Sequence, residues 1–304
     1  MKTNNEFYEQ ELECERLFDA AGPFWFITTD SPDWLLYKSR EEFIAGTNIL
    51  AVSAAESGLT IVGDIQMNNH HHVMGRGTPS QAVVFREIFR EKIRRYQLSI
   101  GNKSLRDWNI RIDPTEDLKS FRNRIAYTDR NAYVVRRDSM PTGYPWGSSY
   151  LMFNGTLWMM DRGEAWASLS IDMKRRICRS HKICLPESYR VLDGMILRGS
   201  FVDYRLTEGL FNSANQYFSF LSRHGEADVE IAQMLGEGFQ LPNEEVFQIV
   251  AGWFRGRSLK ELSAVEKATA AKKMKLRLSA SNKQITQVLQ LPPQDVERLF
   301  PVPH

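Results

Sequence analysis

The sequence has only three cysteines, Cys14, Cys178 and Cys184. They form neither a CxxC pair nor a disulfide framework, a pattern that fits a reducing cytosol better than secretion. No apolar run approaches the roughly 18–20 residues needed to cross a bilayer, and the polar start MKTNNEFYEQELECERLF lacks a signal-peptide core. We therefore expect a cytoplasmic protein that makes no membrane contact.

Net charge is also small, at +2 for 304 residues, so overall charge says little about partners. Its distribution is uneven. Residues 255–283 hold nine Lys or Arg against two acidic residues, a local charge of +7 that leaves −5 for the rest of the chain. Two more basic clusters are FREIFREKIRRY (85–96) and MKRRICRSHK (173–182). Local basic surfaces on a nearly neutral protein indicate contact with a polyanion, although solvated helix faces give the same pattern.

Hydrophobic periodicity predicts four short strands and two amphipathic helices in the first part of the chain. The expected strands are 23–30, 58–67, 70–75 and 108–112, and the expected helices are 39–57 and 78–101. Their order, strand–helix–strand–strand–helix–strand, is that of a ferredoxin-like α+β fold. We expect an antiparallel sheet with helices on one face.

A third helix is predicted to follow the fourth strand, at 113–135. Asp113 would be its N-cap, Pro114 its first residue and Glu116 the acid of a capping box. Its buried stripe would consist of Leu118, Phe121 and Ile125.

The chain beyond a first domain at 1–150 is expected to be all-helical, in two parts. Residues 151–257 form a helical region whose role the sequence leaves open. Residues 258–304 form a basic unit of three helices, one of them capped by Ser281. The break LPP (291–293) gives helix–break–helix, which resembles a DNA-binding helix-turn-helix. A helical oligomerisation tail is the alternative.

Three of the six histidines are consecutive, in MNNHHHVMGR (67–76). On a strand, residues two apart share a face, so His70 and His72 project together and His71 points the other way. Two imidazoles side by side can chelate a metal ion, but two ligands alone make a weak site. The pair is therefore a metal site only if another segment completes it.

The predicted helix at 113–135 carries polar side chains away from its apolar stripe. Tyr127 and Asn131 are four residues apart and so lie about 40° apart on one helical face. That face is not the expected core face, so a tyrosine hydroxyl and a neutral amide oxygen would be available there to a ligand. An ordinary half-buried tyrosine is the alternative.

Three motifs occur in a recognisable order: MNNHHH (67–72), YTDRN (127–131) and YPWGSS (144–149). Together they resemble the single-tyrosine HUH transposases of insertion sequences, especially the branch related to REP-associated tyrosine transposases. In that family His-hydrophobic-His lies on a central strand, a later helix carries YxxxN or YxxxQ, and YPW with small residues comes after it. The resemblance covers roughly residues 22–150 and implies an HUH nuclease core.

The resemblance implies a metal-dependent DNA strand transferase or nickase, as in a transposase. Tyr127 would attack a phosphodiester of single-stranded, hairpin DNA and leave a 5′-phosphotyrosine. His70, His72 and Asn131 would hold Mg²⁺ or Mn²⁺. A homodimer is expected, and in a prokaryote association with the nucleoid.

Arginines, aromatic rings and the C-terminal lysines are the expected DNA contacts, the lysines serving duplex DNA. The candidates are Arg94, Arg95, Arg136, Arg137, Trp146, Lys272, Lys273, Lys275 and Lys283. Trp146 could equally be a core anchor.

Three other functions stay open. His71 stands where the family has a hydrophobic residue, which keeps open a domesticated, non-catalytic DNA-binding protein. A replication initiator or relaxase often carries two tyrosines, but Tyr133 lies about 120° from Tyr127 on a regular helix. An unrelated metalloenzyme would need an acidic ligand near His70, for which Asp64 is the candidate.

Overall fold

The computed structural model describes residues 4–30, 35–102, 105, 108–135, 141–155, 162–180, 185–222, 243–254, 257–278 and 280–300. Backbone contacts divide the chain into two compact units, Met1–Leu221 and Ser222–His304, which are described separately. This division differs from the boundaries expected at 150 and 257. Described residues beyond 150, among them Leu151, Trp166 and Val202, share one hydrophobic core with the preceding sheet and helices, which is why no boundary falls at 150.

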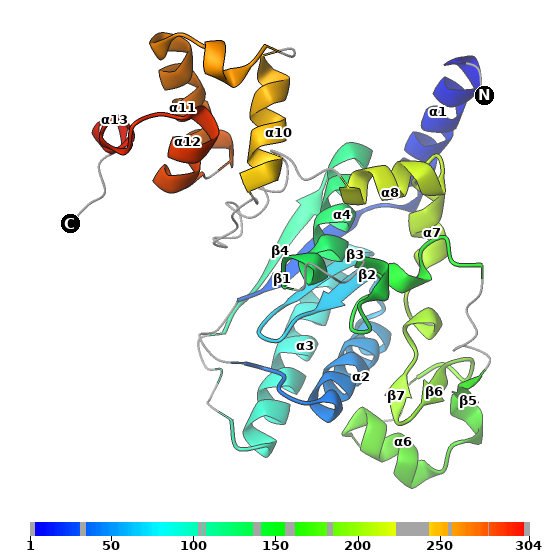
Figure 1. The fold of residues 1–304 in the computed structure, drawn as a ribbon. Coiled ribbons are helices and arrows are strands. Elements are labelled where there is room, and N and C mark those ends of the chain that lie inside the picture. Colours follow the sequence, from blue (N-terminus) through cyan, green and yellow to red (C-terminus); the bar gives the residue numbers. More distant parts are fainter. Residues whose placement is uncertain are drawn as a thin grey trace. The chain divides into compact units, whose positions relative to one another are not determined.

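The first unit is built on a four-stranded antiparallel sheet (Figure 1). Its strands are β1 (Phe24–Thr29), β2 (Thr60–Gln66), β3 (His71–Arg76) and β4 (Ile110–Thr115), in the order β2-β3-β1-β4. Helix α2 (Arg40–Ser57) connects β1 to β2, and α3 (Pro79–Ser99) connects β3 to β4. The predicted strand–helix–strand–strand–helix–strand order is therefore the one observed.

Helices α2 and α3 begin where their capping residues stand. The Ser39 side chain accepts from the Glu42 N–H, and Thr78 forms a capping box with Gln81. The two helices pack against each other and against the side chains of β1 and β3 that point to their face, including Ile27 and Val73. This face of the sheet holds most of the hydrophobic core.

Helix α4 (Leu118–Val135) covers the opposite face of the sheet, together with α1 (Asn4–Ala21). Phe24 of β1 stacks on Phe18 of α1 and meets Phe121 of α4 edge-on, with ring centroids 4.9 Å apart in both pairs. The expectation of helices on one face alone is therefore wrong. It accounted for the connecting helices α2 and α3 but not for α1 and α4.

The start of α4 also differs from the prediction. Asp113 and Pro114 belong to β4, where they pair with Phe26 and Trp25. β4 lies at the edge of the sheet, which is where a strand tolerates proline. The helix begins after Asp117, whose side chain accepts from the Ser120 N–H at 2.7 Å.

The outer edge of β2 is covered by later parts of the chain. Trp146 O accepts from the Gln66 N–H, and Asp64 O accepts from the Ser148 N–H, both at 2.8 Å. Farther along, Val202 forms a parallel bridge with Ile61. The backbone groups of this edge are therefore paired rather than exposed.

Residues 151–222 are not all-helical, contrary to expectation. They contain a three-stranded sheet of β5 (Glu164–Ala165), β6 (Arg190–Leu192) and β7 (Met195–Ile196). Asp193 and Gly194 turn the β6–β7 hairpin with φ of 51° and 78°. Asp-Gly between apolar residues is a strong hairpin signal that the helical interpretation overlooked. The helices here are α6 (Ile171–Cys178), α7 (Tyr204–Gly209) and α8 (Ala214–Ser222).

Short 3₁₀ helices occur in both units. They are η1 (Pro141–Gly143), η2 (Ser149–Leu151), η3 (Trp166–Ser168), η4 (Arg198–Ser200) and η5 (Leu259–Glu261). Arg198 of η4 is 1% exposed and pairs with the fully buried Asp64 of β2, with Nε 3.0 Å from Oδ2. This ion pair joins the region after β7 to the central sheet.

The second unit is a small helical domain with its own apolar core. It contains α10 (Asn243–Trp253), α11 (Ala264–Leu278), α12 (Asn282–Leu289) and α13 (Pro293–Leu299). Ser281 caps α12, as predicted, in a capping box with Gln284. Gln290 ends α12 in the left-handed conformation, with φ 50° and ψ 46°. Across both units, the described helices are all too short or too polar to span a bilayer.

Candidate functional site

The three histidines lie where β3 enters the centre of the sheet. His72 pairs with Thr28 of β1 and Ile65 of β2, so both of its neighbouring strands hold it. His70 comes just before the strand, and its carbonyl accepts from the Met67 N–H at 2.8 Å. The His70 and His72 rings lie on the α4 side with centroids 4.7 Å apart, as the alternation predicts.

His71 points to the α2–α3 face and is fully buried there. Its Nε2 lies 2.7 Å from the Tyr37 hydroxyl, and its ring meets Phe89 of α3 edge-on at 5.2 Å. A polar residue at this apolar position is thus accommodated by a specific partner. Gly46 of α2 makes room for that partner, because a Cβ there would lie 2.8 Å from the Tyr37 ring.

Tyr127 of α4 packs directly on His72. Their ring centroids are 5.4 Å apart with the planes at 71°, and Tyr127 also meets Phe26 edge-on at 6.4 Å. Only 3% of the side chain is exposed. The expectation that Tyr127 lies on a non-core face is therefore wrong.

The sheet-facing surface of α4 is broader than the apolar stripe suggested. Arg124 lies over the Phe26 ring at 5.3 Å, and it extends this surface towards Tyr127. Gly63 of β2 allows the helix to approach closely, since a Cβ there would lie 2.7 Å from Ile125 Cδ1. The sequence alone gave no signal for how closely α4 approaches the sheet.

Asn131 lies one turn after Tyr127 and reaches His70. Burial lowers the pKa of His70 to about 4, and hydrogen bonding from the Asn131 side chain acts against this shift. Burial also lowers the pKa of His72 well below its usual value. Both imidazoles are therefore neutral at neutral pH, which is the form that binds metal ions.

Two residues of β1 belong to the site but were not predicted. The Phe26 ring stacks on His72 with centroids 5.7 Å apart, and Thr28 Oγ1 lies 3.4 Å from His72 Nδ1. Thr28 therefore lies beside the Nδ1 side of the His72 ring, on the neighbouring strand. The alternation of PFWFITTD could have placed both residues on this face.

The donor set fits a divalent metal ion. His70 Nδ1 bonds Asn69 Oδ1 at 2.8 Å, while its buried Nε2 has no well-formed hydrogen bond to any described residue. The described residues contain no group of three or more His, Cys, Asp or Glu side chains suited to a metal. The polar side chain from α4 that lies beside His70 is the neutral amide of Asn131.

Asp64 does not join this site. Its side chain lies on the α2–α3 side of β2, opposite Val73, and is held by Arg198. The unrelated metalloenzyme that needed Asp64 as a ligand is thus not supported by the geometry.

The DNA-contact candidates of the first unit have mixed surroundings. Arg94 and Arg95 both pair with Glu91, at 2.8 and 2.5 Å, although Arg95 remains 76% exposed. The half-buried Trp146 stacks on Phe43 with centroids 4.8 Å apart, so one ring face serves the core. Arg136 and Arg137 lie outside the described residues.

The four lysines of the second unit fall into two groups. Lys272 and Lys283 are exposed. Lys273 lies 3.9 Å from the centre of the Trp253 ring, and Lys275 donates to Ala280 O and Asn282 Oδ1. Two of these lysines thus have structural contacts, and two are available to a partner.

Comparison with known proteins gives one structural similarity. No family model matches the chain, and no curated protein matches it. A solved REP-associated tyrosine transposase bound to a REP hairpin is 13% identical, with a TM-score of 0.33, over 43% of this chain and 79% of that one. This similarity is distant, and a function for the chain therefore has to rest on the geometry of its own site.

Proposed function

We propose that this protein is a metal-dependent DNA strand transferase or nickase that acts through Tyr127, as a tyrosine transposase does. The observation that carries the proposal is the convergence of Tyr127, His72, His70 and Asn131. They come from two segments more than fifty residues apart and meet on one face of the sheet. A nucleophile beside a neutral imidazole pair and an amide oxygen is an arrangement suited to phosphoryl transfer.

The Tyr127 hydroxyl would attack the phosphorus of one phosphodiester in single-stranded DNA. A bond forms between Tyr127 Oη and phosphorus, the bond from phosphorus to the 3′-oxygen breaks, and the hydroxyl proton leaves for the departing oxygen or solvent. Mg²⁺ or Mn²⁺ bound by His70, His72 and Asn131 would supply charge stabilisation at the phosphate oxygens. The phosphotyrosine linkage conserves the free energy of the broken phosphodiester bond, so a second 3′-hydroxyl can later attack it and rejoin the strand.

The burial of Tyr127 sets a condition on this chemistry. At 3% exposure, a phosphate reaches the hydroxyl only when neighbouring side chains move. η1 packs beside α4, and Tyr144 after it donates to Gln66 O at 3.0 Å. We infer that DNA binding displaces this segment, which carries the YPW motif.

The second unit supports a DNA-binding role through its last two helices. Gln290 adopts the left-handed conformation that a glycine usually provides in a helix-turn-helix, and three residues separate α12 from α13. Pro292 precedes α13, so the prolines start the second helix rather than preventing it. We propose that duplex DNA binds here, with Lys283 and Lys272 contacting phosphates.

A non-catalytic DNA-binding protein is the second candidate. The near-complete burial of Tyr127 favours it, because a tyrosine without a catalytic role can remain packed on Phe26 and His72. A homodimer and association with the nucleoid remain part of both proposals.

The deciding experiment is a cleavage assay on labelled single-stranded hairpin DNA with Mn²⁺. We expect a protein–DNA adduct that resists boiling in SDS and is absent with Tyr127→Phe and with EDTA. Binding without any adduct across a broad hairpin library would favour the non-catalytic protein. An adduct that persists in Tyr127→Phe would move the nucleophile to another tyrosine, Tyr133 first.

A further inference from the structure

Two basic clusters that are far apart in the sequence meet at one pocket of the first unit. The pocket has a volume of about 220 Å³ and lies where the C-terminal half of α3 meets the end of α6. Lys92 and Arg95 come from the cluster at 85–96, and Arg179 from the cluster at 173–182. The proposed active site uses none of these residues.

The three cations differ in how they are neutralised. Lys92 pairs with Glu56 at 3.1 Å and Arg95 with Glu91 at 2.5 Å. The Arg179 guanidinium stacks on the Tyr96 ring at 4.4 Å, and no carboxylate of the described residues lies within ion-pair distance of it. Arg179 therefore brings an uncompensated positive charge to the pocket, held in place by an aromatic ring.

The backbone of Arg179 has a conformation that is unusual for this residue type. It follows α6 in the left-handed conformation, with φ 50° and ψ 36°. Glycine adopts this conformation most readily at a helix end, and arginine does so rarely. The chain carries a long cationic side chain where a glycine would fit the backbone better.

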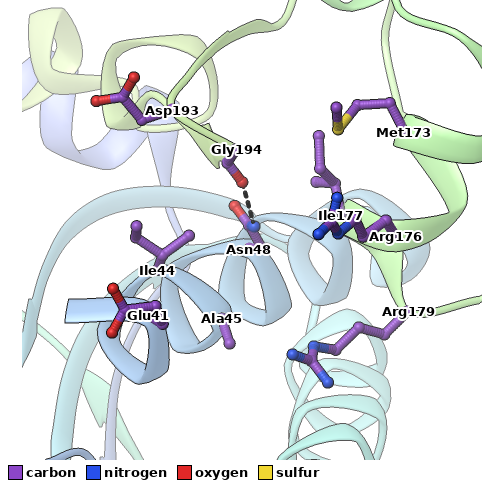
Figure 2. A pocket seen from close by; sticks show the side chains of 10 residues that line it. All are labelled: Glu41, Ile44, Ala45, Asn48, Met173, Arg176, Ile177, Arg179, Asp193 and Gly194. Carbon is purple, nitrogen blue, oxygen red and sulfur yellow. Dashed lines mark hydrogen bonds between the residues drawn. The ribbon is translucent and has the colours of Figure 1, made fainter. Parts of the chain in front are cut away.

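A second, larger pocket shares Arg179 with the first, and Figure 2 shows the side chains that line it. Its volume is about 450 Å³. Ile44 and Ala45 of α2 and Ile177 of α6 give it apolar walls, and Figure 2 shows Arg176 and Arg179 on the side away from Glu41 and Asp193. A small basic pocket beside a larger, partly apolar one matches the two halves of a nucleotide.

We propose that these two pockets bind one nucleotide of a DNA strand, with its phosphate at Arg179, Lys92 and Arg95 and its base in the larger pocket. Because α2 and α3 cover the face of the sheet opposite Tyr127, the site anchors DNA away from the scissile phosphate. The proposal rests on the proposed function for the identity of its ligand, DNA. It predicts a binding effect that does not depend on Tyr127.

The test measures the affinity of the full chain for a fluorescent single-stranded oligonucleotide by anisotropy, over a range of salt concentrations. Arg179→Gly removes the guanidinium and suits the left-handed backbone, and Arg179→Ala checks that result. Arg175→Ala is the matched control, since Arg175 lies on α6 four residues before Arg179, is half exposed and lines neither pocket.

We expect both Arg179 variants to bind DNA about 5- to 10-fold more weakly than the wild type. The slope of the logarithm of the binding constant against the logarithm of the salt concentration should be shallower by about 0.7, as for one lost phosphate contact on a single strand. Arg175→Ala should bind like the wild type. Unchanged affinity and slope in Arg179→Gly, with an unchanged melting temperature, would overturn the proposal. So would an equal loss in Arg175→Ala.

Competition separates the two sources of phosphate. A deoxynucleoside monophosphate should displace the oligonucleotide from the wild type better than inorganic phosphate does, and Arg179→Gly should lose this difference. Equal competition by inorganic phosphate would overturn the assignment of the larger pocket to a base. If the wild type forms no tyrosine adduct but Arg179→Gly weakens binding, the proposed function fails and this inference stands.

Discussion

The two faces of the central sheet treat neighbouring histidines differently. His71 meets a single hydroxyl, that of Tyr37, inside a closed aromatic and aliphatic core. His72 faces the other way, between Phe26 and Tyr127, with His70 and Asn131 beside it. On the face of His71, the Tyr37 hydroxyl meets His71 Nε2, while the buried Nδ1 of His71 has no hydrogen bond to a described residue. The other face differs because it gathers several polar side chains at one place, which is typical of a site for a ligand.

The strongest test of this contrast is Tyr127→Phe. Removing one oxygen from the α4 face should abolish the DNA adduct completely, because the proposal assigns the attacking atom to the Tyr127 hydroxyl. The ring contacts with His72 and Phe26 remain, so the free energy of unfolding should change by less than about 1 kcal/mol. Adduct yield on denaturing gels and urea unfolding measure the two effects. A variant that unfolds without losing the adduct would reverse the assignment of this residue.

Arg198→Met probes the α2–α3 side. Burial raises the pKa of Asp64 and Arg198 lowers it, so removing Arg198 leaves a buried carboxyl without its partner. We expect a loss of about 3–5 kcal/mol in unfolding free energy.

The matched control for Arg198→Met is the double variant Asp64→Asn/Arg198→Met. It removes both charges and should recover most of the lost stability, as measured by urea unfolding. If the double variant is no more stable than Arg198→Met, the loss comes from packing rather than from the unpaired charge.

Substituting the two histidines in parallel compares the faces directly. His72→Ala should lower metal-dependent cleavage by more than about 100-fold and weaken Mn²⁺ binding, since a direct ligand matters more than the outer partners of a site. His71→Val should leave cleavage nearly intact and lower stability by about 1–3 kcal/mol, because the Tyr37 hydroxyl loses its partner. Calorimetry with Mn²⁺ and thermal unfolding provide the readouts. Equal losses of cleavage and of Mn²⁺ affinity in the two variants would contradict the assignment of different roles to the two faces.

Tyr37→Phe gives the smallest expected effect. It removes the hydroxyl that bonds His71 Nε2, at a cost of about 1 kcal/mol. DNA cleavage and Mn²⁺ affinity should not change, because the site lies across the sheet. A large loss of cleavage would show that the α2–α3 face positions the metal site through β3.

Local patterns predicted the parts of the fold that depend on local rules. The alternation along HHH placed His71 opposite its neighbours, and Ser281 marked the start of α12 as capping chemistry requires. The same local reasoning misplaced the start of α4, because Asp113 and Pro114 fit a helix start as well as they fit an edge strand.

Features that depend on distant parts of the chain were beyond sequence patterns. Tyr37 is 34 residues from His71, and Arg198 is 134 residues from Asp64. The short segments from which local patterns are read therefore contain neither pair. The burial of Tyr127 depends on how closely α4 approaches Gly63, which is set by tertiary packing. Motif order suggested which residues meet, whereas packing decided how accessible they are.

The covered edge of β2 also constrains how copies of this protein can associate. A second chain cannot lengthen the sheet at β2, because residues 146–148 and Val202 already occupy that side. At the opposite edge, Pro114 removes one N–H donor from β4. We therefore expect any association between copies to use helices or loops rather than a continuous intermolecular sheet, and the sheet to be a poor template for fibrous aggregation.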